Sequence, residues 1–212
     1  MSRMQSEDDL VRCIKTDFYP VFQSRDLQPK KTREEEAWNL LCANRGNYTR
    51  QVIDQVFDVV DYDPYAPNQR WFGQLLIVPN RNRMFQLPST VESINRWIDN
   101  LLFSGDVLEK RLATAEQTRP KGASKGIATL FLYLQDPKEY NVWLPTTHQS
   151  LELLGRIQGL EEPDWSKNYP VFNAAAISFR DKHGFEPHEV DWALWMIEMI
   201  TRNSPALDRY CS

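Results

Sequence analysis

Residues 119–155 read RPKGASKGIATLFLYLQDPKEYNVWLPTTHQSLELLG, and the interpretation of the whole chain starts from this stretch. Its glycines and polar residues at 118–124 predict a short hairpin, and the apolar run at 125–135 predicts a helix. An Asp-Pro pair then breaks that helix, and a second proline predicts the start of another helix over 145–155. Residues 107–117 also predict a helix, so the helices at 107–117 and 125–135 are expected to meet at the tight glycine-containing turn.

The sequence on the C-terminal side of this stretch also predicts helices. Apolar residues at helical spacing indicate a helix over 171–183, closed by Gly184, after a loop at 161–166. Pro187 suits the first position of a last helix, because its missing N–H has no intrahelical partner there. No strand pattern is expected in this half.

The N-terminal side is predicted to contain separate helices. An amphipathic pattern indicates a helix over residues 9–22, and Pro20 is expected to end it. Residues 28–33 are then expected to form a polar connector. Thr32 and Glu35 have the spacing of a capping box, which predicts that the next helix begins there.

Between these regions the pattern is less regular. Residues 71–78 are short and apolar, which fits either a buried strand or one helical turn. Residues 79–83, Pro-Asn-Arg-Asn-Arg, are expected to form a turn. Ser89 and Glu92 have capping-box spacing and predict the start of another helix.

These patterns together predict an all-α fold, with at most one short strand near 71–78. Gly105 lies at the exit of a predicted helix and suggests a boundary between two parts. We expect an N-terminal helical part at 1–105 and a second helical part at 106–212. A chain of 212 residues is long enough to bury a substantial core.

Charge and cysteine content narrow the functional classes. The net charge is −4, yet residues 70–125 hold nine basic and five acidic residues, so a locally positive face is expected. The three cysteines, Cys13, Cys42 and Cys211, are odd in number, widely spaced and outside any CxxC or Cys/His cluster, so neither a disulfide framework nor a structural zinc site is expected. No signal peptide or membrane-spanning run is visible, which favours a cytoplasmic protein with no membrane partner.

The central stretch resembles the helix-hairpin-helix core of the base-excision DNA glycosylase superfamily. That family has a Gly-x-Gly hairpin, a helix rich in small residues, an Asp-Pro-like break, a short extended piece and a helix that ends in Leu-Gly. The matching positions in this chain are Gly122, Ala123, Ser124, Lys125, Gly126, Ala128, Asp136, Pro137, Val142, Leu154 and Gly155.

The resemblance also implies a biological setting. Residues 184–195, GFEPHEVDWALW, are similar to the end of glycosylase-like helical domains appended to bacterial restriction and phage-defence proteins. A larger defence-system protein is therefore one expected partner.

A hairpin of this kind can hold DNA by its phosphates. Glycine allows close backbone approach, and the first amides of the following helix have no intrahelical acceptor. Asn and Arg in the turn at 79–83 are also side chains that bind phosphates and base edges. The expected DNA-binding residues are Arg119, Lys121, Gly122, Ser124, Lys125, Gly126, Asn80, Arg81 and Arg83.

Two departures from the family concern its chemistry. The family's catalytic lysine and aspartate positions are matched by Gly126 and Leu144, and neither can form a Schiff base or transfer a proton. The second hairpin glycine of the family is Ser124. His183 and His188 lack a Cys or carboxylate at ligand spacing, so no metal or other cofactor is expected.

The sequence therefore favours a non-catalytic module that binds or senses duplex DNA, in a restriction or phage-defence context. Two alternatives stay open. One is a protein–protein adaptor that docks onto a larger complex, and the other is an unusual DNA-modifying enzyme. Salt-dependent duplex binding would distinguish the first reading from the adaptor.

Overall fold

The chain is all-α. The computed structural model describes residues 6–61, 71–72, 75–76, 78–160 and 164–210, and no strand is present among them. The α-helices are α1 (Glu7–Cys13), α2 (Tyr19–Val21), α3 (Leu27–Ala43), α4 (Arg50–Asp61), α5 (Val78–Met84), α6 (Val91–Phe103), α7 (Leu108–Gln117), α8 (Lys125–Gln135), α9 (Pro145–Leu153), α10 (Trp165–His183) and α11 (Val190–Thr201). Two π-helical segments, η1 (Ile14–Phe18) and η2 (Phe22–Asp26), and two 3-10 helices, η3 (Pro187–Glu189) and η4 (Pro205–Tyr210), complete the set.

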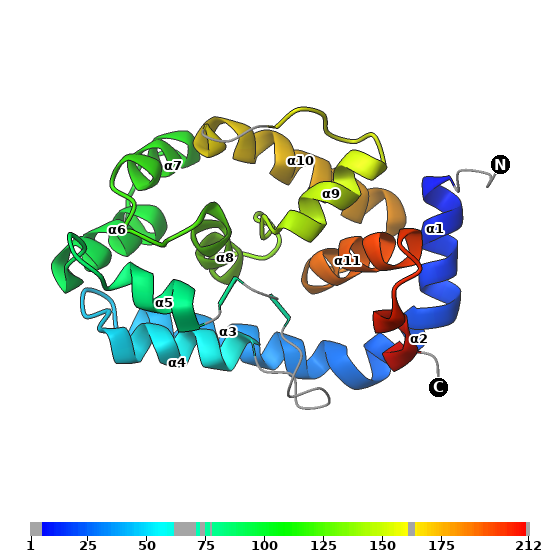
Figure 1. Cartoon of the computed structure of the whole chain (residues 1–212), viewed down its shortest axis with the longest axis horizontal. Coiled ribbons are helices and arrows are strands. Elements are labelled where there is room, and N and C mark those ends of the chain that lie inside the picture. The colour runs from blue at the N-terminus through cyan, green and yellow to red at the C-terminus, as the bar shows by residue number, and fades with distance from the viewer. Residues whose placement is uncertain (1–5, 62–70, 73–74, 77, 161–163, 211–212) are drawn as a thin grey trace.

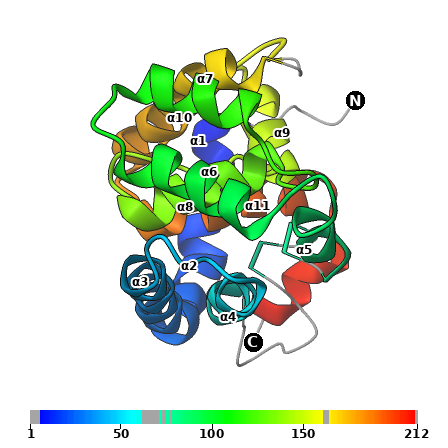
Figure 2. The ribbon, with the colours of Figure 1, turned by 90° about the vertical axis from the view of Figure 1, so that its left-hand side faces the viewer.

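The helices form three layers around α8. In Figure 1, α3 and α4 lie along one side of the molecule and α7, α9 and α10 along the other. Figure 2 shows the same order from the end of the molecule, with α6 and α8 between α3 and α4 on one side and α7 and α10 on the other. Nine consecutive residues of α8, Gly126 to Leu134, are buried. This fits an apolar helix that is surrounded by others.

The N-terminal part differs from expectation, because helical backbone continues from Glu7 to Ala43. The expected helix end at Pro20 is wrong, because Pro20 lies within α2. The expected connector at 28–33 is also wrong, because these residues belong to α3, and Thr32 therefore lies inside that helix and does not cap it. The prolines at 20 and 29 follow π turns, in which Tyr19 N–H bonds Ile14 O and Leu27 N–H bonds Phe22 O. A π turn moves the bonding carbonyl one residue back, which accommodates a nearby proline.

The central segments also need correction. The described residues of 71–78 form turns and the start of α5, so the strand alternative is wrong for them. Residues 79–83 are helical and belong to α5, although their composition predicts a turn. The cap of α6 is Thr90, whose hydroxyl accepts from Ser93 N at 3.1 Å, one residue after the expected Ser89.

The expected helices around the hairpin are confirmed. The bounds of α7 and α8 agree with the sequence pattern within a residue, and α9 begins at the expected Pro145 but ends at Leu153, two residues early. Helix α10 ends at Gly184, with φ of 65°, and Pro187 opens η3 just before α11. Helix α10 begins at Trp165, earlier than expected, and so takes in the end of the predicted loop.

The two expected parts share one interior. Buried apolar side chains from both sides of Gly105 belong to the same core cluster. Trp97 of α6 donates from its indole nitrogen to Ala115 O of α7 at 2.8 Å. Near the other end, Glu7 of α1 pairs with Arg156, which follows α9. The division of the chain into separate folding units at Gly105 therefore stays a prediction.

Candidate nucleic-acid interface

The hairpin between α7 and α8 is fixed by local hydrogen bonds. Ala123 N donates to Pro120 O at 3.0 Å, and the Ser124 hydroxyl caps α8 by accepting from Ile127 N at 3.4 Å. Lys121 N donates to the Ser89 hydroxyl at 3.0 Å, which ties the hairpin to the loop before α6. The backbone of the hairpin is therefore held in place on two sides.

Gly122 brings the hairpin against α5. Its φ is +89°, and a Cβ built there would lie 2.4 Å from the Arg83 Cβ and 3.1 Å from Met84 N. A side chain would therefore be strained and would also collide with α5. Because of this close approach, Arg83 and Lys121, which are distant in sequence, lie on neighbouring segments of one surface.

Gly126 is packed in a similar way inside the protein. A Cβ at this buried position would lie 2.7 Å from Leu75 Cδ1 and 3.3 Å from Trp143 O. Leu144, at the position of the family's aspartate, is 7% exposed and donates its N–H to the Thr147 hydroxyl at 3.0 Å. No titratable side chain occupies either position.

Three cations of this surface have no carboxylate partner. Arg83, Arg119 and Lys121 are exposed, and none forms an ion pair with another residue that the structure describes. Most other basic side chains do pair, for example Lys110 with Asp106 at 2.7 Å. Lys125 is half-buried, with its amine 4.2 Å from the centre of the Trp143 ring.

Three of the expected DNA-binding residues do not lie free at the surface, because Gly126 is buried and the side chains of Asn80 and Arg81 make internal hydrogen bonds. Asn80 donates from its side chain to Leu75 O at 3.2 Å. Arg81 is 4% exposed, and its guanidinium contacts Leu76 O and the Asp58 carboxylate, each at 2.5 Å. In a turn both side chains would be free to face solvent. In the helix α5, residues two positions apart face opposite sides. Arg81 therefore faces the interior and Arg83 faces solvent.

A group of buried ionisable residues was not anticipated from sequence. It joins α3, α8 and the η3–α11 region, and its members are Lys30, Glu34, Tyr133, His188 and Asp191; we call it the buried charge cluster. Lys30 Nζ lies 2.5 Å from Glu34 Oε1, 3.1 Å from the Tyr133 hydroxyl and 3.2 Å from Asp191 Oδ1. His188 Nδ1 lies 2.6 Å from Glu34 Oε2.

Burial and the neighbouring charges act in opposite directions on the pKa values of this cluster. Burial lowers the pKa of Lys30, but Asp191 and Glu34 outweigh it and leave the pKa raised. Burial raises the pKa of Glu34, but Lys30 and His188 outweigh it and leave the pKa lowered. For Asp191 burial prevails and its pKa is raised. Only the spacing of Lys30 and Glu34 along one helix face could have indicated a pair from sequence.

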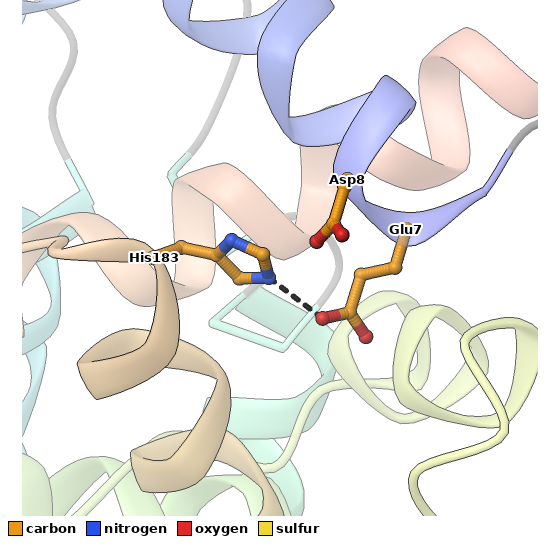
Figure 3. A group of neighbouring side chains, drawn as sticks. All are labelled: Glu7, Asp8 and His183. Carbon is orange, nitrogen blue, oxygen red and sulfur yellow. Dashed lines mark hydrogen bonds and ion pairs between the residues drawn. The ribbon is translucent and has the colours of Figure 1, made fainter.

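Glu7, Asp8 and His183 form a second cluster that resembles a cation site. Figure 3 shows the two carboxylates of α1 and the imidazole at the end of α10 pointing toward one another. His183 Nε2 lies 2.6 Å from Glu7 Oε1. However, Arg156 pairs with both Glu7 oxygens at 2.7 Å, and Lys182 is 2.8 Å from one of them.

These cations already neutralise the carboxylate. The hydrogen bonds from Arg156, aided by Lys182 and His183 and opposed by burial, lower the pKa of Glu7 to about 2. A metal ion would have to displace or face this positive charge. The cluster therefore holds α1 against the end of α10. Because Glu7 and His183 are far apart in the sequence, this contact could not be predicted from residue spacing.

An open depression lies along α4 and beside Arg33 of α3. It has a volume of about 1000 Å³ and its lining includes Arg33, Arg50, Asp54 and Asp58. Asp58 is 2.5 Å from Arg81, and Asp54 is 3.5 Å from Arg50. Both carboxylates are thus partnered by arginines, and they do not present the unpaired acid and base that hydrolytic chemistry needs.

Comparison with known proteins adds no family. Scans against protein-family models, curated proteins and solved structures each found no match to this chain. Among the described residues, no helix combines the length and the apolar character that a membrane crossing requires.

Proposed function

We propose that this chain binds the backbone of duplex DNA, without acting on the DNA chemically, through the surface formed by Arg83, Arg119 and Lys121; we call it the hairpin surface. The observation that carries the proposal is that these exposed cations lack carboxylate partners among the described residues, while Gly122 packs their two segments together. Unpaired cations on a rigid support are what phosphate oxygens require.

The resemblance to glycosylases supports the choice of ligand, and the positions of Gly126 and Leu144 support the lack of chemistry. Incubation with lesion-bearing or methylated duplexes, with and without Mg²⁺, is expected to return intact DNA. Turnover that is lost on mutation of one residue would contradict this part of the proposal. A restriction or phage-defence setting, with a larger partner protein, follows from the resemblance alone.

The free thiols of Cys13 and Cys42 fit the reducing cytoplasm that we propose as its location.

A protein–protein adaptor is the second candidate. Val78, the first residue of α5, is 54% exposed, and Leu87, three residues after the end of α5, is 81% exposed. Exposed apolar side chains next to a polar rim are typical of docking sites. Such a surface would bind its partner with little dependence on salt.

The test is a double charge reversal, Arg83→Glu with Lys121→Glu. Duplex affinity is expected to fall to a similar extent for all sequences, because backbone contacts carry no base information. Arg12→Glu is the matched control, since Arg12 is 73% exposed on α1, far from the hairpin in Figure 1. Circular dichroism checks the fold of both variants. Unchanged affinity in the double variant would favour the adaptor.

A further inference from the structure

Leu87 is the most exposed large apolar side chain among the residues that the structure describes, at 81%. It lies in the loop between α5 and α6, and this loop is attached to the hairpin on both sides of the leucine. Before the loop, Arg83 packs against Gly122, and within it the Ser89 hydroxyl accepts from Lys121 N at 3.0 Å. Leu87 therefore lies next to the hairpin surface.

The loop holds Leu87 at the tip of a tight turn. Ser89 N donates to Gln86 O at 3.0 Å, so Leu87 and Pro88 are the two central residues of this turn. Just before it, Gln86 N donates to Arg83 O at 3.2 Å. The proline ring restricts the backbone further. A side chain on such a fixed support can bind without the entropy cost of ordering a flexible loop.

The surroundings of Leu87 are cationic. No carboxylate occurs between Arg83 and Thr90, and Glu92, which follows them, is paired with Arg96 at 2.7 Å. Arg83 and Lys121 form no ion pair with the described residues. An apolar side chain beside such cations matches a ligand with an apolar interior and an anionic exterior, and duplex DNA is a ligand of this kind.

Intact duplex DNA offers little to an exposed leucine, because its base pairs are stacked on one another. Opening a base step costs about as much free energy as burial of one leucine provides, so the two nearly cancel. At a nick or a gap one backbone is interrupted, and the stack opens at a much lower cost. Burial of the leucine is then a net gain, which corresponds to about tenfold or more in affinity.

We propose that Leu87 inserts at an open base step, so that this chain prefers nicked or gapped duplex DNA to intact duplex. The inference rests on the proposed function, because Arg83, Arg119 and Lys121 supply the phosphate contacts that bring Leu87 to the bases. These cations set the affinity for any duplex, since phosphates are present in all of them. The leucine adds the preference for an interruption.

The experiment compares duplexes of one sequence that are intact, nicked or interrupted by a one-nucleotide gap. Fluorescence anisotropy gives the affinity of wild type, Leu87→Ala and Leu87→Met for each duplex. Wild type and Leu87→Met are expected to bind the interrupted duplexes at least about tenfold more tightly than the intact one. Leu87→Ala is expected to bind all of them alike, with the wild-type dependence on salt.

Leu153→Ala is the matched control. Leu153 is 55% exposed at the end of α9, outside the hairpin surface, and its loss should leave the preference unchanged. Substitutions of exposed side chains usually have little effect on stability, and circular dichroism checks the fold of each variant.

A fluorescent base reports the insertion itself. 2-Aminopurine placed beside the nick is quenched while it is stacked. Its fluorescence should rise when wild type or Leu87→Met binds, and should stay low with Leu87→Ala.

The outcomes separate this inference from the proposed function. Equal affinity of wild type for intact and interrupted duplexes, with salt-dependent binding retained, would overturn the inference and leave the proposed function standing. A preference that survives in Leu87→Ala would overturn the role of Leu87. Absence of salt-dependent binding to every duplex would overturn both, and a partner protein would then be the better occupant of this surface.

Discussion

The buried charge cluster and the hairpin surface both contain a lysine, and the two lysines are in opposite situations. Lys30 has a side chain that is 1% exposed and is surrounded by Glu34, Asp191 and Tyr133. Lys121 is exposed, with no ion pair to any described residue. Charges in the cluster satisfy one another and stabilise the fold, whereas the hairpin surface leaves its charges available to a ligand.

Helix α5 repeats this contrast over two residues. Arg81 is buried against Asp58 and over the Phe57 ring, with 5.5 Å between the guanidinium carbon and the ring centre. Arg83 is exposed and touches Gly122 of the hairpin through its Cβ and backbone. A cluster of arginines in the sequence is therefore divided by the helix into one structural and one ligand-accessible side chain.

The largest expected effect comes from the same substitution in the two regions. Lys30→Met leaves two buried carboxylates without their amine and should cost about 3–5 kcal/mol of unfolding free energy. Lys121→Met should cost about 0.5 kcal/mol or less, because its charge is solvated. Urea denaturation measures both. Equal effects would remove the contrast between the two lysines.

The second effect concerns how the hairpin surface is assembled. Gly122→Ala combines left-handed strain with a clash against α5, and about 2–4 kcal/mol of stability should be lost. Gly46→Ala is the matched control, because its φ is +74° with nothing within 4 Å of a built Cβ. It should cost about 1–2 kcal/mol, from strain alone. The melting temperature of both variants measures these costs. If both fall by a similar amount, α5 moves aside at little cost and the clash at Gly122 is unimportant.

A smaller effect is expected where α1 meets α10. The pKa of Glu7 is lowered to about 2, so the stability that it contributes is present above its unfolded value of 4.5 and is lost as the pH falls toward 2. Glu7→Gln should cost about 1–2 kcal/mol near neutral pH, after allowance for solvent screening. The unfolding curves of wild type and variant should converge in acid; a constant gap would argue against ionic pairing.

The sequence was sufficient to predict the helices on both sides of the hairpin because their signals are local. Ser124 caps α8, and Gly184 ends α10 through a positive φ, as the residue types indicate. The N-terminal helices were misjudged at Pro20, since two π turns accommodate the prolines and no composition rule indicates a π turn. Tertiary contacts there override local propensity.

The candidate site was predictable in part. Arg83, Arg119 and Lys121 were all among the expected DNA-binding residues, yet their grouping depends on Gly122 packing against α5, which is a long-range contact. The different roles of Arg81 and Arg83 could not be predicted, because a turn at 79–83 would leave both arginines exposed. Glu34 lies one helical turn from Lys30, but the other two side-chain partners of Lys30, Tyr133 and Asp191, come from α8 and α11, more than a hundred residues away along the chain.

The most direct test of the central claim is the dependence of duplex affinity on salt concentration. Each phosphate contact contributes about 0.9 to the slope of log affinity against log salt. Arg83→Ala with Lys121→Ala should therefore lower the slope by up to about 1.8, while Arg12→Ala should leave it unchanged. A wild-type chain without salt-dependent duplex binding, or a double variant with the wild-type slope, would contradict the assignment of the hairpin surface to DNA.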